Sequence, residues 1–171
     1  MPLTTSLNVR LSATLTKTID LITAGLTAPL AVNDTLSLAT GTASGLADIV
    51  FWDTRTLAAS ATENIDLAGV LVDAFGATLT FVKVKMLYVR AAAANNAANN
   101  VVVGGAAANG FFGPFNAATD KVSLAAGDIF LATKTATGWT VTAATGDILL
   151  IANSAGTNAV TYDIVVVGTS A

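Results

Sequence analysis

Apolar and polar side chains alternate from Leu7 to Leu21. Odd positions are apolar and even positions carry Asn, Arg, Ser, Thr or Asp, with Lys17 as the one interruption. Successive side chains of a β-strand point to opposite faces, so this period predicts a strand or hairpin with one solvated face. Lys17 indicates a turn or an end, and a Gly, Ala and Pro connection leads to a short strand at Thr35–Ala39.

This alternating segment allows two placements. An ordinary strand of the body is the favoured one, because a period of two is what a half-buried sheet produces. The alternative is strand addition to a neighbouring subunit, since an edge strand offers free backbone donors and acceptors.

Short apolar runs follow, separated by turn residues at intervals of about ten residues. No run is followed by a convincing amphipathic helix pattern, which argues against an α/β fold, and Gly69–Ala77 is expected to be a helical turn or a loop. The predicted strands are Asp48–Ala58, Asn64–Ala68, Thr78–Arg90, Asn100–Val103, Lys121–Ala125, Ile129–Thr133, Trp139–Thr142, Ile148–Ala152 and Thr161–Gly168.

This spacing predicts an all-β fold, an antiparallel β-sandwich of jelly-roll type. Residues 46–171 are expected to form the sandwich body. Residues 1–45 are expected to form an N-terminal β segment or arm, with its membership of the same domain left open.

Charge and composition exclude several functional classes. Only 11% of the residues are charged, and the net charge of -3 is too small to indicate a nucleic-acid partner. The start of the chain has no apolar leader, and Asn, Gly and Pro interrupt residues 91–119, so neither a targeting segment nor a membrane span is expected. The chain is therefore expected to bind neither nucleic acid nor a membrane.

Catalytic and metal-binding residues are scarce. The chain has no His and no Cys, which removes the usual general base, the thiol nucleophile and the common zinc ligands. Glu63 is the single Glu, while Asp48 and Asp53 are spaced to lie on opposite faces of a strand. We therefore expect no enzyme activity, no catalytic residue, no metal site and no cofactor.

Two similar stretches place a Gly-Asp pair directly before an apolar strand. They are Gly127-Asp128 and Gly146-Asp147. The favoured interpretation is a shared turn, in which Gly supplies a positive φ and Asp caps the turn. Calcium binding is the alternative, but two isolated carboxylates are too few for a shell of six or more oxygens.

Residues 91–119 carry no charged side chain and are rich in Ala, Gly and Asn. We interpret this stretch as a subunit contact loop plus a buried strand, with low-complexity disorder as the alternative. Phe111, Phe112 and Phe115 lie in a loop with Gly and Pro, where three rings are hard to bury in one small domain. They are the expected centre of a contact between subunits or with a partner.

Two further predictions concern exposed side chains. Lys83 and Lys85 are expected on a solvated strand face opposite Val82, Val84 and Met86, where charge prevents unwanted edge pairing. The alternative is that both lysines meet acidic groups of a partner.

Sugar binding would require an exposed Trp52 or Trp139 beside Asp or Asn in a groove. Core packing is the favoured interpretation of both tryptophans, because aromatic side chains dominate the cores of small β proteins.

Part of the sequence resembles a family of small structural proteins of tailed bacteriophage virions. The resemblance rests on three motifs, Ala47–Gly69, Leu71–Phe81 and Thr145–Gly168. It implies a virion component, similar in size and β-rich character to capsid decoration (cement) proteins. Such proteins commonly form trimers that clamp the major capsid protein.

The function expected from these observations is a non-enzymatic decoration protein. It would act as a homotrimer on the outer capsid surface of the virion, after synthesis in the host cytoplasm, and would stabilise the shell of major capsid protein. The alternative is a tail- or fibre-associated module that recognises a host-surface carbohydrate.

Overall fold

The computed structural model of the protein describes residues 2–19 and 22–171, and every regular element among them is a β-strand. The predicted all-β class is therefore confirmed for this part of the chain. Asp20 and Leu21, at the end of the predicted alternating segment, lie outside the described residues.

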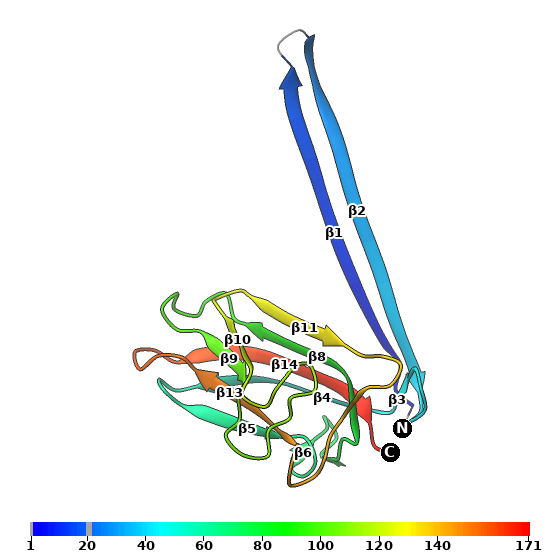
Figure 1. The fold of residues 1–171 in the computed structure, drawn as a ribbon, viewed down its shortest axis with the longest axis vertical. Coiled ribbons are helices and arrows are strands. Elements are labelled where there is room, and N and C mark those ends of the chain that lie inside the picture. Colours follow the sequence, from blue (N-terminus) through cyan, green and yellow to red (C-terminus); the bar gives the residue numbers. More distant parts are fainter. Residues whose placement is uncertain (1, 20–21) are drawn as a thin grey trace.

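The first two strands form a long antiparallel hairpin, called here the arm, which extends far away from the rest of the molecule (Figure 1). It consists of β1 (Thr5–Ile19) and β2 (Ile22–Thr40). The end of β2 pairs in parallel with the short β3 (Leu46–Ala47). The favoured placement of Leu7–Leu21 as an ordinary strand of the body is wrong, because β1 pairs with β2 and not with a strand of the body's sheets.

β2 also corrects the expected connection and short strand at Thr35–Ala39, because one strand continues from Ile22 to Thr40. Pro29 lies inside it, opposite Thr14. Proline lacks the backbone N–H and is tolerated on edge strands, and both strands of a two-stranded ribbon are edges. The Gly, Ala and Pro residues therefore predicted a connection where the structure has a continuous strand.

The body contains two larger sheets, and all strand pairings within them are antiparallel. The large sheet has the order β11 (Ile129–Thr133), β8 (Lys83–Ala91), β14 (Val160–Thr169), β4 (Ile49–Leu57), and β12 (Trp139–Thr140) also pairs with β8. The small sheet has the order β10 (Lys121–Leu124), β9 (Val101–Gly104), β13 (Ile148–Asn153), β5 (Thr62–Asp66).

Most predicted strands correspond to observed ones within a few residues. The exception is the predicted Thr78–Arg90, which the structure divides into β7 (Thr78–Leu79) and β8. β7 pairs with β6 (Leu71–Val72), inside the segment expected to be a helical turn or loop. Asp73 shapes the turn between them by accepting backbone N–H bonds from Phe75 and Ala77 at 2.8 and 2.9 Å.

One hydrophobic cluster joins the two larger sheets. It contains Leu87 and Ile164 of the large sheet together with Val103 and Ile151 of the small sheet, all fully buried. Burying a Leu or Ile side chain stabilises the fold by about 1.5–3 kcal/mol, so this cluster holds the two sheets together.

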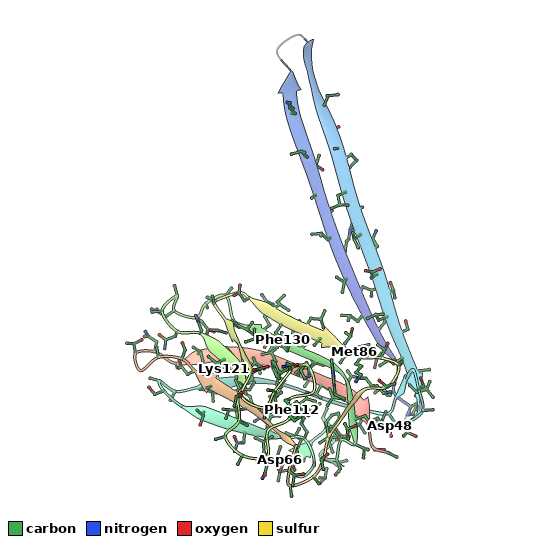
Figure 2. The ribbon with its side chains drawn as sticks, viewed as in Figure 1. Asp48, Asp66, Met86, Phe112, Lys121 and Phe130 are labelled. Atoms are coloured by element: carbon green, nitrogen blue, oxygen red, sulfur yellow. The ribbon has the colours of Figure 1, made fainter. Side chains whose placement is uncertain are left out.

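A second, smaller cluster fixes the base of the arm to the outer face of the large sheet. Leu38 of β2 and Ala47 of β3 are buried there against Met86 of β8 and Val167 of β14. Figure 2 labels Met86 beside the point where the arm leaves the body. The division of the chain at residues 45 and 46 stays a prediction.

Candidate interaction surfaces

The arm is an amphipathic ribbon. Opposite pairs on one face are Leu7 with Leu36, Leu11 with Val32, Ala13 with Leu30 and Leu15 with Ala28. The other face carries polar pairs such as Ser6 with Ser37 and Asn8 with Thr35, whose side chains hydrogen bond at 2.8 Å. Figure 2 shows the side chains of the arm standing clear of the body. This arrangement gives the protein a long apolar surface outside its own core.

The outer face of the large sheet is also apolar close to the arm. Four cross-strand neighbours form one row, called here the apolar row, which consists of Leu131, Tyr88, Val165 and Trp52. Two open clefts of about 300 and 290 Å³ lie between this face and the base of the arm. Leu7 and Leu131 line both of them, so apolar side chains form both walls.

Trp52 is 54% exposed at the edge of the apolar row, and its expected core packing is therefore wrong. It points away from the inter-sheet cluster because Phe51, the preceding residue, points into it. Trp52 lies between two open clefts of about 340 Å³ each. Polar residues of the second cleft are Asp53, Arg55, Asn64 and Asp73.

Trp139 meets the favoured expectation, because it is half-buried and packs against the inter-sheet cluster. A Cβ on Gly113 would lie 2.4 Å from the Cβ of Trp139, so only glycine lets the loop pass this close.

The three phenylalanines of the Gly/Pro loop occupy different environments. Phe111 is 4% exposed and belongs to the inter-sheet cluster, so its expected exposure is wrong. Phe115 packs against the same cluster and stacks on Phe130, with ring centroids 5.7 Å apart. Phe112 is 48% exposed and is labelled on the body in Figure 2. The contact between subunits stays a prediction, and among these three rings Phe112 is available to make it.

Amide side chains within residues 91–119 hold neighbouring loops together. Asn99 is fully buried, and its amide nitrogen donates to Asn153 Oδ1 at 3.0 Å and to the carbonyl of Asn158 at 2.8 Å. Asn95 donates to the carbonyl of Thr161 at 2.9 Å and accepts from its N–H at 2.8 Å. The asparagines therefore replace strand pairing where the loops cross β13 and β14. The predicted buried strand Asn100–Val103 is observed as β9.

Lys85 corrects the expectation of two exposed lysines, because it is 1% exposed. The pairing of β8 with β14 shifts between Met86 and Val84, which interrupts the alternation at Lys85. Its amine donates to the carbonyl of Ala136 at 2.8 Å, and burial, followed by the charge of Lys83, lowers the pKa of Lys85. Lys83 is partly exposed.

Both Gly-Asp stretches form turns capped by the Asp, as the favoured interpretation predicts, but only one of the two glycines has the predicted positive φ. Gly127 has a φ of 87°, whereas in the second turn Ala144 and not Gly146 has a positive φ. Asp128 accepts the N–H of Ala125 at 2.9 Å, and Asp147 accepts the N–H of Ala144 at 2.6 Å. Asp120 makes the same bond to Ala117 at 2.9 Å, a third instance that sequence reasoning missed. In the described part of the chain no three Asp or Glu side chains gather as a metal site would require.

Glu63 is bonded on both of its oxygens. One accepts from the guanidinium of Arg55 and the other from the hydroxyl of Tyr162 at 2.8 Å. Arg55 also donates to Asp53 at 2.9 Å. Burial, followed by the bond to Glu63, raises the pKa of the Tyr162 hydroxyl above its usual value of 10.0. This group connects the two sheets, since Arg55 and Tyr162 belong to the large sheet and Glu63 to the small one.

Comparison of the chain with protein-family models, curated proteins and solved structures finds no match. Within residues 2–19 and 22–171, no helix is long and apolar enough to cross a membrane.

Proposed function

We propose that this chain is a non-enzymatic structural protein of a tailed-phage virion, a capsid decoration protein that binds and stabilises the shell of major capsid protein. It would act on the outer surface of the capsid, after synthesis in the host cytoplasm, as a homotrimer. We also interpret the two larger sheets as the halves of an antiparallel β-sandwich of jelly-roll type, because one hydrophobic cluster joins them.

The arm is the observation that carries this proposal. A catalyst or a free monomer has no use for a long ribbon with a bare apolar face, whereas an assembly subunit does. A second argument is the resemblance of Ala47–Gly69, Leu71–Phe81 and Thr145–Gly168 to small phage virion proteins. A third is that both oxygens of Glu63, the single Glu, are used in structural bonds.

The experiment is to incubate the purified protein with empty shells of the phage that encodes it and to sediment the shells. We expect binding that saturates at a fixed number of copies per shell and a higher temperature of shell disruption. Labelling intact particles with antibodies against the body should place the protein on the capsid. Absence from both shells and particles would contradict the proposal.

A second candidate function is carbohydrate recognition by a tail- or fibre-associated module. It is favoured by the exposed ring of Trp52 beside a cleft with Asp53, Asn64 and Asp73, since a ring face stacks on a sugar while the polar groups bind its hydroxyls. Titration of a panel of host-surface glycans should then quench the fluorescence of Trp52, and Trp52→Ala should abolish binding while Trp139→Phe retains it. Particle labelling restricted to the tail would favour this function.

A further inference from the structure

Beyond its base, the arm has an apolar face that no other part of the described chain covers. Leu11, Leu15 and Leu30 are each more than half exposed on it. A two-stranded hairpin is only marginally stable alone in water, and exposed leucines add to the cost. The face is therefore better suited to contact with protein than to contact with water.

A matching surface lies on the large sheet. The apolar row runs across four strands, with Leu131 and Trp52 exposed at its ends and Tyr88 and Val165 half-buried between them. Side chains of one row in a sheet stand next to one another, so these four make a continuous strip.

The base of the arm shows that these two surfaces pack together. Leu7 and Leu36, from the same face of the arm, contact the cluster of Met86 and Val167, which are next to the apolar row on the same strands. The apolar row continues this sheet face, and the outward leucines continue this arm face. The contact at the base therefore shows the kind of packing that the rest of the arm face and the apolar row would make if they met.

The arm cannot complete this interface within its own chain. It rises away from the large sheet (Figure 1), and open clefts already lie between the two surfaces at the base of the arm. The accessible surface of the chain is 9283 Å². That is roughly a fifth more than the area expected for a compact monomer of this mass. The excess is what an arm held apart from its body produces.

We propose that copies of this chain associate by arm exchange: the apolar face of one copy's arm lies on the apolar row of a second copy. The ribbon is about 10 Å wide, and the apolar row crosses four neighbouring strands, which is about 20 Å, so one contact covers about 200 Å² on each partner. Each copy gives one arm and receives one, which makes about 400 Å² per copy. Stable protein interfaces bury about 600–1,000 Å² per partner, so we expect a reversible association.

The chemistry of both surfaces favours a second copy over a charged partner. The apolar face of the arm carries one acid, Asp34, and one base, Lys17, and the apolar row carries no charge. Recognition of a nucleic acid or an acidic peptide requires a patch of one sign, which this face lacks. The polar face of the arm, with its Ser, Thr and Asn side chains, stays in contact with water.

The mass in solution tests the exchange. Leu11→Thr with Leu30→Thr removes apolar contacts and puts a β-branched residue, which favours strands, at both positions. Thr14→Ser with Thr16→Ser is the control on the polar face. We expect sedimentation equilibrium to give at least twice 17.1 kDa for the native chain and the control, and 17.1 kDa for the leucine variant. A native mass of 17.1 kDa throughout the micromolar range, or an unchanged mass of the leucine variant, would overturn the exchange.

Engineered disulfides test which surfaces meet, because the chain has no Cys of its own. One sample carries Leu11→Cys or Leu15→Cys on the arm, and a second carries Leu131→Cys on the sheet. After mixing and mild oxidation we expect the mixed dimer to predominate, while Thr16→Cys on the polar face gives little. Dominant dimers of the arm variant with itself would mean that arms pair with arms, and the proposal would be wrong.

The exchange requires only this chain and is independent of the capsid proposal. If the leucine variant is monomeric yet still binds empty shells, exchange holds and another surface contacts the capsid. If the native chain is monomeric and binds shells through the leucines of the arm, exchange and the proposed homotrimer fail while capsid decoration stands. If the native chain oligomerises through its arm but does not bind empty shells, the proposed function fails while exchange holds.

Discussion

At the scale of single residues, the bond between Tyr162 and Glu63 makes a prediction about pH. Tyr162 keeps its proton in the folded protein above pH 10, where the tyrosine of the unfolded chain loses it. The unfolded state then binds fewer protons, so the contribution of Tyr162 to stability is complete below pH 10 and falls as the pH rises further. The contribution of Lys85 to stability changes in the opposite direction and rises with pH, because burial, followed by the charge of Lys83, lowers the pKa of Lys85 in the folded protein.

Comparison with Tyr162→Phe isolates the tyrosine from Lys85. At neutral pH we expect this variant to lose about 1–3 kcal/mol of unfolding free energy, because one oxygen of Glu63 loses its donor. The difference from the native chain should shrink as the pH rises above 10. Urea unfolding at a series of pH values measures it, and a difference that stays constant to pH 11 would contradict the assignment.

Phe111 and Phe112 are adjacent in sequence but differ in burial, and their substitutions should differ accordingly. Phe111→Ser removes a core ring and should lower the unfolding free energy by about 3–5 kcal/mol. Phe112→Ser changes a half-exposed ring and should cost about 0.5 kcal/mol or less. Urea unfolding separates the two, and sedimentation of Phe112→Ser tests the predicted subunit contact. A large loss of stability in Phe112→Ser would mean that this ring is also structural.

At the scale of elements, the arm should be removable without loss of the body. Asn8 and Thr35 face each other across the ribbon, so residues 9–34 can be replaced by an Asn-Gly turn that closes a short hairpin. Leu7, Leu36 and Leu38 remain to anchor the base, and we expect the shortened chain to keep a cooperative unfolding transition. Circular dichroism during heating checks this, and loss of the transition would show that the outward arm stabilises the body.

The elements also show what the sequence could and could not predict. Apolar runs between turn residues identified strands such as Ile129–Thr133 correctly. Period-two alternation predicted a strand over Leu7–Leu21, and β1 occupies Thr5–Ile19. The same alternation could not distinguish a strand of the body from a free ribbon, since both have one apolar face. The connection predicted around Pro29 is wrong, because proline disfavours a strand only where its missing N–H would donate to a neighbouring strand.

The interaction surfaces were less predictable than the fold. The exposure of Trp52 depends on which strands lie beside β4, and burial of Lys85 depends on a one-residue shift against β14. Both are consequences of pairing between distant segments, which local patterns do not contain. The sequence showed that Phe111, Phe112 and Phe115 lie close together, but it could not show that Phe111 is buried while Phe112 is exposed.

At the scale of the whole molecule, arm exchange links thermal stability to concentration. Association of folded copies stabilises the folded state by mass action, so the melting temperature of the native chain should rise with protein concentration. The chain shortened between residues 9 and 34 should melt at one temperature throughout. Calorimetry over a hundredfold dilution series compares the two, and a melting temperature of the native chain that does not move would contradict exchange.

The position of β14 has a consequence for the order in which the protein folds. Val160–Thr169 lies between β8 and β4 and pairs with both, so the large sheet cannot close until the last strand has left the ribosome. The arm consists of neighbours in sequence and can close much earlier, because short loops cost less entropy. The apolar residues of the arm therefore leave the ribosome before the body that covers the base of the arm exists, and nascent chains on one polysome are brought together while these residues have no partner in their own chain.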